Sequence, residues 1–367
     1  MEKIKVLVVE ESLMFRSLLV KYINMDPDLS VVAVASDPFE ARDDIIRYKP
    51  DVMTLDVELP KMDGIEFLRK LMPQYPMHTI VISSLSNRVF DALNAGAVDF
   101  VAKPLTTNKE ALDEFVKKEL PGKIKVAATA KIRKTYAQKV LEQGTIPKMP
   151  IAGNDGENPP NVSLRRDEHL IVAIGASTGG TEATTSILEQ FGPDIPGVVV
   201  TQHMPEGFTK MYADRLNQRS NIRLTVKEAQ SGDIVLPGHV YIAPGGDKHM
   251  EIVRANNQYK IVLKRGEKVN GHRPSVEVLF QSVAREAGKN AVGIILTGMG
   301  GDGAKGLLAM KRAGAKTIGQ DESTCVVYGM PRVAYEMGAV DYQEKLQNIP
   351  RKTYSIIAQM QKENEIP

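Results

Sequence analysis

The chain has 367 residues, with 47 lysine and arginine residues against 45 aspartate and glutamate residues, so its formal net charge is only +2. A balance this even gives no overall preference for nucleic acid or for an acidic membrane surface. The single cysteine, Cys325, excludes an internal disulfide framework and a cysteine-based zinc site, which fits a reducing compartment.

The first residues, MEKIKVLVVEES, are basic and then apolar. Their apolar run is only about five residues, shorter than the roughly 7 to 15 residues of a signal-peptide core. No stretch approaches the ~18 apolar residues of a membrane-spanning helix. We therefore expect a cytoplasmic protein without direct membrane insertion.

Strand-like and helix-like segments alternate strictly up to about residue 120. The strand-like runs, rich in Val and Ile, are KVLVV (5–9), VVAVA (31–35), DVMTLDV (51–57), TIVISSL (79–85) and DFVAK (99–103). Between them, apolar residues recur at three- and four-residue spacing, as in amphipathic helices. This alternation predicts an α/β domain over residues 1–120, a doubly wound, flavodoxin-like parallel sheet covered by helices on both faces.

The pattern stops over residues 121–166. Lys and Arg are scattered through 117–148, GNDGENPPN follows, and large apolar residues are few. This composition indicates a linker with a short helix around 131–142. Its flexible-coil span is on the order of 40 Å, enough to let two domains meet or separate.

The alternation resumes over residues 167–360 with LIVAIGAS, GVVVTQHM, AVGIILTG and KTIGQD as strand-like runs. Residues 222–265 hold short β-like pieces separated by turn residues. We predict a second doubly wound α/β domain, Rossmann-like, with a β-rich insertion.

Polar side chains follow several strands of the first domain: Glu10 and Glu11, Asp56, Ser83 and Lys103. Loops after parallel strands gather at one edge of the sheet, so these groups should converge. Taken singly, each is more simply a solvated loop end. Clustered carboxylates repel one another unless a cation sits among them, and oxygen ligands of this kind suit magnesium. A lysine nearby can stabilise a phosphoryl group.

This set resembles the receiver domain of two-component response regulators, with TLDVELPKMDG around Asp56 and a proline after Lys103. The resemblance implies that Asp56 accepts a phosphoryl group from a histidine kinase. It also implies that Glu10, Glu11 and Asp56 hold magnesium. By the same resemblance, Ser83 is the switch hydroxyl and Lys103 contacts the phosphate.

Two features depart from that family. Most receivers have aspartate where Glu11 stands, and the extra methylene moves the carboxylate at a metal that demands octahedral geometry. The chain between SSL (83–85) and GAVDF (96–100) is also short, so we expect a clipped fourth loop and helix.

The second domain opens with IVAIGASTGG at 171–180, and three functions compete for Ser177. A nucleotide-binding turn requires Gly-x-Gly-x-x-Gly or a lysine after the glycines, and GASTGG has neither. A nucleophile elbow fits the Gly-x-Ser-x-Gly pattern, although α/β hydrolases place the acid before a late histidine. A plain turn with a helix-capping hydroxyl is the third alternative.

The next strand favours the nucleophile. GVVVTQHMP ends in His203, and adjacent strands lie only ~4.8 Å apart, so serine and imidazole come within reach of each other. Asp302, in ILTGMGGDG just past another strand, can fix the imidazole, because triads are defined by geometry and not by chain order. The free amides of the helix after Gly180 and of the GMGG glycines are candidate oxyanion donors.

Three further residues lie in polar loops, APGGDKHM and GHRPS, that border the predicted cleft. For His249 and His272 we favour a surface or structural role. Arg273 can bind an anionic group or bridge a loop.

Six blocks together resemble the catalytic domain of the chemotaxis protein-glutamate methylesterase (CheB) family, which places this domain behind a receiver. They are IGASTGGTEA, TQHMPEGFTKMYADRLN, VLPGHVYIAPGGDKHM, HRPSVEVLFQSVA, ILTGMGGDGAKGLLAM and CVVYGMPRVA. The family's triad falls on Ser177, His203 and Asp302. Thr178 and the backbone amide of Met299 match further active-site positions.

The resemblance implies hydrolysis of glutamate methyl esters on the cytoplasmic helices of methyl-accepting chemoreceptors, with release of methanol, and deamidation of receptor glutamines. It requires no cofactor for the esterase reaction, and magnesium only for receiver phosphorylation. It also implies that the receiver covers the cleft until phosphorylation at Asp56 shifts the population to an uncovered state.

Two alternatives belong to other classes. One is a phosphorylation-controlled binding module without catalysis, because fold alone does not give function. The other is a transcription regulator, but no helix-turn-helix pattern or basic recognition helix follows the linker, so we expect no nucleic-acid partner.

Overall fold

The computed structural model describes the chain except for residues 1, 85, 104–108, 133–163 and 364–367. The chain divides into two compact units, Met1–Met149 and Pro150–Pro367, which we call the first and second domains. None of the described helices has the length and apolar character needed to cross a lipid bilayer.

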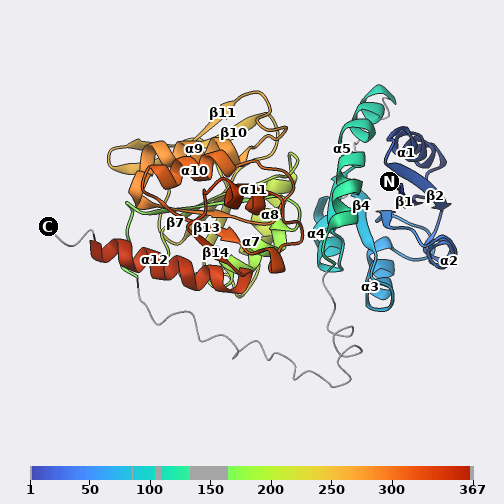
Figure 1. The fold of residues 1–367 in the computed structure, drawn as a ribbon, viewed down its shortest axis with the longest axis horizontal. Helices are drawn as coiled ribbons and strands as arrows, with labels where there is room; N and C mark the ends of the chain where they lie inside the picture. The colour runs from blue at the N-terminus through green and yellow to red at the C-terminus, as the bar shows by residue number, and fades with distance from the viewer. Residues whose placement is uncertain (1, 85, 104–108, 133–163, 364–367) are drawn as a thin grey trace, which may run out of the picture. The chain divides into compact units, whose positions relative to one another are not determined.

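The first domain is a five-stranded parallel sheet flanked by helices (Figure 1). Its elements in chain order are β1 (Ile4–Val9), α1 (Leu13–Met25), β2 (Leu29–Ala35), α2 (Pro38–Tyr48), β3 (Val52–Asp56), α3 (Gly64–Gln74), β4 (His78–Ser83), α4 (Ser86–Asn94), β5 (Asp99–Ala102) and α5 (Lys109–Thr129). The strand order β2-β1-β3-β4-β5 confirms the predicted doubly wound sheet. It also places the ends of β1, β3, β4 and β5 side by side.

Burial explains why the strands of this sheet form where they do. All five residues of β3 are buried, as expected for a central strand with helices on both faces. The helices begin at capping carboxylates: Asp37 accepts from the amides at the start of α2, and Asp63 does so for α3. Helix α4 is present as nine residues, so the expected clipping did not remove it.

Ordered structure extends into both ends of the range 121–166 that the sequence predicts to be a linker. Helix α5 continues past residue 120 to Thr129, because Leu120, Ile124 and Ala127 are buried along it. At the other end, the amide of Leu164 donates to Asp194 (3.0 Å), which ties this residue to the second domain. Most of the short helix expected around 131–142 lies outside the described residues.

The second domain is built on a seven-stranded parallel sheet of order β14-β13-β12-β6-β7-β9-β8. Its strands are β6 (Ile171–Ala176), β7 (Gly197–Gln202), β8 (Thr225–Glu228), β9 (His239–Ile242), β12 (Ala291–Ile295), β13 (Lys316–Gln320) and β14 (Tyr342–Glu344). Its helices are α7 (Gly180–Leu188), α8 (Phe208–Asn217), α9 (Val276–Ala287), α10 (Ala304–Arg312), α11 (Met330–Glu336) and α12 (Ile349–Glu363). Short 3₁₀ turns are Gly288–Asn290, Glu322–Thr324 and Leu346–Asn348. Helices α9 and α10 cover one face of the sheet, and α7 and α12 the other (Figure 1).

The β-rich insertion is smaller than predicted. Strands β8 and β9 extend the main sheet, with β9 pairing in parallel with β7. Only β10 (Lys248–Ala255) and β11 (Gln258–Arg265) form a separate antiparallel hairpin. The hairpin packs on α9, which links it to the face of the sheet that carries the predicted Asp302 loop.

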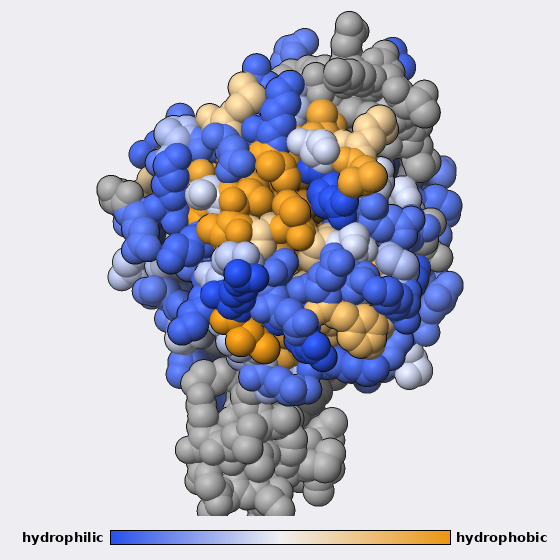
Figure 2. All heavy atoms as spheres, turned by 90° about the vertical axis from the view of Figure 1, so that its right-hand side faces the viewer, coloured by the Kyte–Doolittle hydropathy of each residue, from blue (hydrophilic) through white to orange (hydrophobic). Residues whose placement is uncertain are grey.

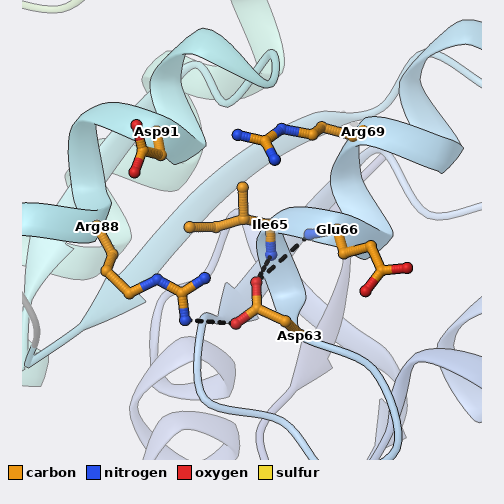
Figure 3. A pocket seen from close by; sticks show the side chains of 6 residues that line it. All are labelled: Asp63, Ile65, Glu66, Arg69, Arg88 and Asp91. Atoms are coloured by element: carbon orange, nitrogen blue, oxygen red, sulfur yellow. Dashed lines mark hydrogen bonds and ion pairs between the residues drawn. The ribbon is translucent and has the colours of Figure 1, made fainter.

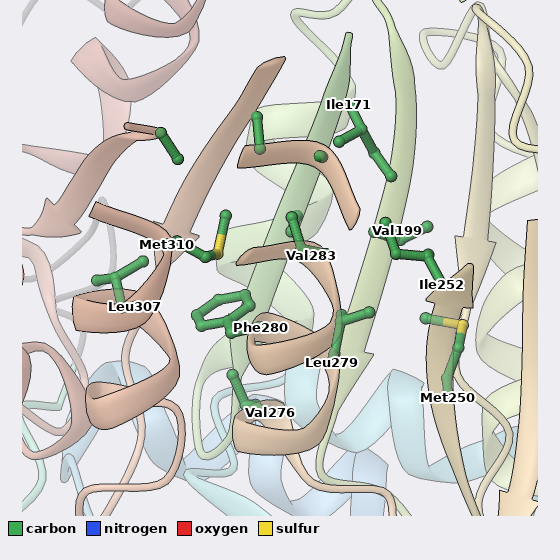
Figure 4. Packing of buried hydrophobic residues seen from close by; sticks show 14 of the residues in the cluster. Ile171, Val199, Met250, Ile252, Val276, Leu279, Phe280, Val283, Leu307 and Met310 are labelled. Carbon is green, nitrogen blue, oxygen red and sulfur yellow. The ribbon is translucent and has the colours of Figure 1, made fainter. Parts of the chain in front are cut away.

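A large hydrophobic core of the second domain lies under α9 and α10 (Figure 4). Phe280 of α9 is fully buried there between Val276, Val283, Leu307 and Met310. It also approaches glycines on both neighbouring elements, so that a Cβ added at Gly306 would lie 2.7 Å from the Phe280 side chain.

We expect Phe280→Ala to lower the free energy of unfolding of the second domain by about 3–5 kcal/mol, because the packed ring leaves a cavity that glycines cannot fill. Tyr335→Ala is the matched control, since that ring is 54% exposed and its loss should cost about 0.5 kcal/mol or less. Urea unfolding of both variants checks the difference. Equal losses would contradict the assigned core.

Candidate active site and phosphoacceptor site

Ser177 stands at the tight turn between β6 and α7. Its amide donates to the carbonyl of Thr297 (3.1 Å), and its own carbonyl accepts from the amide of Gly180 (2.7 Å). The turn requires glycine at 179, where φ is +76° and an added Cβ would lie 2.6 Å from Val326. The turn thus presents a half-buried serine directly before the amino end of a helix.

His203 follows the neighbouring strand, as the sequence predicts. Strands β6 and β7 pair in parallel with Ala176 opposite Gln202, so Ser177 and His203 each come directly after a paired residue. The amide of His203 donates to the carbonyl of Ala176 (3.1 Å). The two side chains therefore start from the same edge of the sheet, one strand apart.

The imidazole of His203 is hydrogen-bonded to Asp302: its Nε2 lies 2.8 Å from Asp302 Oδ2. The carboxylate is buried at the amino end of α9. It accepts hydrogen bonds from the Ser275 hydroxyl (2.7 Å), the Val276 amide (2.7 Å) and the Asn270 side chain (2.8 Å). The structure thus brings the predicted histidine and aspartate together in a donor-rich pocket.

This environment keeps Asp302 ionised. Burial acts to raise its pKa, but the hydrogen bond and charge of His203, with the hydrogen bonds of Asn270 and Ser275, hold the pKa well below its ordinary value. The negative charge is available to stabilise an imidazolium at His203.

The other ring nitrogen of His203, Nδ1, is buried and has no hydrogen-bond partner within the described part of the chain. Because the Nε2 hydrogen is donated to Asp302, Nδ1 carries the free lone pair. The ring of His272 stacks on that of His203, with centroids 3.7 Å apart and planes 11° apart. The hydrogen bond to Asp302 and the stacking on His272 thus hold the imidazole in place, and the lone pair of Nδ1 is left to accept a proton.

The two predicted oxyanion residues lie on loops next to Ser177. Thr178 is buried, and its carbonyl accepts from the Thr297 hydroxyl (3.0 Å). Met299 is 49% exposed, and its amide donates to no group among the residues that the structure describes. The preceding Gly298 packs against Ser177, since an added Cβ there would lie 2.7 Å from the serine Cβ.

Sequence reasoning missed part of this site. Asn270 and Ser275 bind Asp302 directly, and His249, which we expected in a polar loop, is buried behind them. A serine directly before an apolar helix is a capping signal that could have pointed to Ser275. Arg273 bridges loops by donating to the carbonyls of Gly246 (2.7 Å) and Gly266 (2.6 Å).

Asp302→Asn should lower kcat for ester hydrolysis by about a thousandfold or more. The amide loses the charge that stabilises the imidazolium, and its NH₂ group faces donors from Ser275, Val276 or Asn270. Steady-state methanol release measures the effect. Asp214→Asn, on an exposed face of α8, is the control and should leave the rate unchanged. Similar rates in both variants would refute this assignment.

In the first domain, the ends of three strands meet at Lys103. Its ammonium lies 2.9 Å from Glu10 Oε2, after β1, and 2.8 Å from Asp56 Oδ2, at the end of β3. Ser83 ends β4 and is fully buried, and its carbonyl accepts from the Lys103 amide (2.8 Å). The structure thus brings together four of the five groups expected to converge, whereas Glu11, the fifth, is exposed.

The charge balance of this cluster suits a further cation. Burial and the neighbouring Asp56 raise the pKa of Glu10 to about 7, although Lys103 opposes the rise. Two buried carboxylates thus share one ammonium, and their oxygens are the ligands that magnesium prefers. Glu11 is exposed, and within the described residues no three acidic, His or Cys side chains are grouped to hold a metal.

A separate pocket of about 430 Å³ lies between α3 and α4 (Figure 3). Its lining is mostly charged: Asp63, Ile65, Glu66, Arg69, Arg88 and Asp91. Figure 3 shows Asp63 turned toward Arg88, and the two form an ion pair. None of the predicted site residues lines this pocket, so it belongs to neither site.

Comparison with known proteins identifies both domains. A model of the response regulator receiver domain matches residues 6–117, and a model of the CheB methylesterase matches residues 172–353. The folds and sites thus define a response regulator whose second domain is a hydrolase.

One solved structure is similar to part of the chain, and two full-length relatives narrow this class. The crystal structure of the Thermotoga maritima CheB methylesterase catalytic domain is 41% identical and covers 53% of this chain and 100% of its own, with a TM-score of 0.49. The protein-glutamate methylesterase/protein-glutamine glutaminase 2 of Syntrophomonas wolfei is 53% identical over 98% of this chain and 99% of its own length. A relative of the same activity name from Sulfurimonas denitrificans is 46% identical, with 97% and 99% coverage. This chain belongs to the protein-glutamate methylesterase/protein-glutamine glutaminase family.

Proposed function

We propose that this protein hydrolyses glutamate methyl esters on the cytoplasmic helices of chemoreceptors, releases methanol, and deamidates receptor glutamines, under control of phosphorylation at Asp56. The observation that carries the proposal is the imidazole of His203. Its Nε2 is held by Asp302, and its buried Nδ1, one strand away from Ser177, has no hydrogen-bond partner among the residues that the structure describes. Membership in the family supports the same conclusion.

Acyl transfer begins at Ser177. Its Oγ attacks the side-chain carbonyl carbon of the methyl ester while His203 Nδ1 takes the hydroxyl proton. The tetrahedral intermediate then expels methoxide, which leaves as methanol with the proton from His203. Water repeats the sequence on the acyl-enzyme, so that free glutamate and Ser177 are regenerated. With a glutamine substrate, ammonia leaves in place of methanol.

The oxyanion of the tetrahedral intermediate needs donors that are already in place. Three groups are candidate donors around the serine turn: the amide of Met299, which has no acceptor among the described residues, the residue Thr178, and the amino end of α7. Fixed amide dipoles stabilise a developing negative charge without reorganisation. The esterase reaction requires no metal or other cofactor in this scheme.

Control comes from the first domain. Asp56 accepts the phosphoryl group, Lys103 contacts it, and Ser83 is the switch hydroxyl. Glu10 and Asp56 would hold magnesium, with Glu11 as the third ligand by the family resemblance alone, and the ion would supply positive charge at the phosphoryl group. The ammonium of Lys103, which contacts both Glu10 and Asp56, supports its proposed contact with the phosphoryl group.

The phosphodonor is a histidine kinase, which must reach Asp56 past the start of α1. Leu13 and Met14, the first two residues of α1, are 72% and 69% exposed. Figure 2 shows a group of apolar side chains ringed by hydrophilic ones on the face that it views. Such a patch is typical of a protein-binding surface. Kinase, receptor helices and enzyme then meet in the cytoplasm.

Methanol and ammonia release test the proposal together. The full-length protein is incubated with a methylated chemoreceptor cytoplasmic fragment, and in parallel with its glutamine-containing form. We expect methanol from the first and ammonia from the second. A protein that binds the fragment but releases neither product would be a binding module, and the proposed activity would be refuted.

A further inference from the structure

The imidazole of His249 lies behind the triad, outside the groups used above. His249 belongs to β10 of the hairpin and is 5% exposed. Its Nε2 lies 2.8 Å from the carbonyl oxygen of Glu267, and its Nδ1 lies 3.2 Å from the amide nitrogen of Ser275.

These two partners fix the ring's tautomer. A carbonyl oxygen only accepts, so Nε2 carries the hydrogen; a backbone amide only donates, so Nδ1 carries the lone pair. The ring is therefore neutral and bridges the loop after β11 to the start of α9. A ring present only to fill space would need neither contact.

Ser275 links His249 to the triad, because it contacts both His249 and Asp302. It is 1% exposed and caps α9 by accepting from the Glu277 amide (3.1 Å). Its hydroxyl donates to Asp302 Oδ1 (2.7 Å), and the amide of Val276 donates to Asp302 Oδ2 (2.7 Å). Two of the donors that orient the carboxylate thus come from the residue that His249 holds and from the next one.

We propose that His249 is a positioning residue for the triad: its neutral ring holds Ser275, and through it the Asp302 carboxylate, in the geometry that His203 needs. This inference rests on the proposed serine-nucleophile chemistry. Buried networks of this kind rigidify a site when every member is satisfied. Loss of the Nδ1 acceptor leaves the Ser275 amide without a partner and loosens both donors to Asp302.

Side-chain substitution separates positioning from packing. His249→Asn retains an oxygen near the place of Nδ1 but leaves a cavity. His249→Phe fills the space but accepts nothing, and His249→Gln retains a donor near the place of Nε2 only. Positioning predicts that Asn is the most active variant, whereas packing predicts that Phe is.

The readout is the reaction of Ser177 with a fluorophosphonate, in which Oγ displaces fluoride from phosphorus. It reports on activation of the serine whether or not receptor esters are the substrate, so failure of the proposed substrate is scored separately. The full-length variants are compared at saturating probe, with thermal unfolding measured alongside.

We expect the limiting rate of labelling to fall roughly tenfold or more in the Phe and Gln variants, with an unchanged half-saturating concentration, and to stay within about threefold of wild type in Asn. If Phe fails to fold, the comparison of Gln with Asn decides. A Phe variant as fast as wild type, or a Gln variant equal to Asn, would overturn the inference.

Discussion

Ser177→Ala should reduce methanol release by at least about a thousandfold, because it removes the hydroxyl that we propose as the nucleophile of the acyl transfer. The change removes one oxygen from a half-buried residue whose backbone hydrogen bonds to Thr297 and Gly180 remain. The fold should therefore persist. Methanol release at saturating receptor fragment, with and without a phosphodonor, measures the loss.

Ser186→Ala provides the matched control. Ser186 lies on α7, the helix that follows the nucleophile turn, and it is half-buried like Ser177. We expect wild-type turnover from this variant. A Ser177→Ala enzyme with the rate of the control would show that hydrolysis occurs elsewhere or without a serine nucleophile.

Asp56→Asn should abolish both phosphorylation and its stimulation of the esterase. An amide is a poor nucleophile for phosphorus, and it removes the charge that pairs with Lys103. Its oxygen can still accept from the Glu58 amide, as Asp56 Oδ1 does at 3.0 Å, so the loop should keep its shape. Intact mass after incubation with magnesium and acetyl phosphate detects the phosphoryl group.

Asp63→Asn is the comparison for this experiment. Asp63 is another carboxylate of the same domain, where it caps α3 and pairs with Arg88. That variant should still gain one phosphoryl group and still be stimulated. A mass increase that persists in Asp56→Asn would place the phosphoacceptor at a different residue.

Much of the fold follows from local sequence, and the exceptions have physical causes. Pro121 and Gly122 indicate the end of a helix, yet α5 continues through both to Thr129. Burial of Ile124 and Ala127 against the first domain outweighs the local penalty, and no local pattern shows that contact. In the same way, the short strands β8 and β9 resemble an insertion until it is known that β9 pairs with β7 and β8 with β9.

The site was predictable to the extent that it depends on strand ends. Ser177, His203 and Asp302 each follow a strand, and parallel sheets gather such positions at one edge. The donors to Asp302 were not predictable, because Asn270 and Ser275 reach it only through the way α9 docks on the loop after β12. For Glu11, the position after a strand was misleading. Its neighbour Glu10 is 1% exposed and contacts Lys103, whereas Glu11 is exposed and has no described contact with Lys103.

The most direct test of the account is the rate of methanol release from a methylated receptor fragment by the full-length protein, measured before and after addition of a phosphodonor with magnesium. The account predicts a measurable basal rate that rises on addition of the phosphodonor. Methanol release that is absent in both conditions would contradict the hydrolase, and an active enzyme whose rate is unmoved by phosphorylation at Asp56 would contradict its regulation.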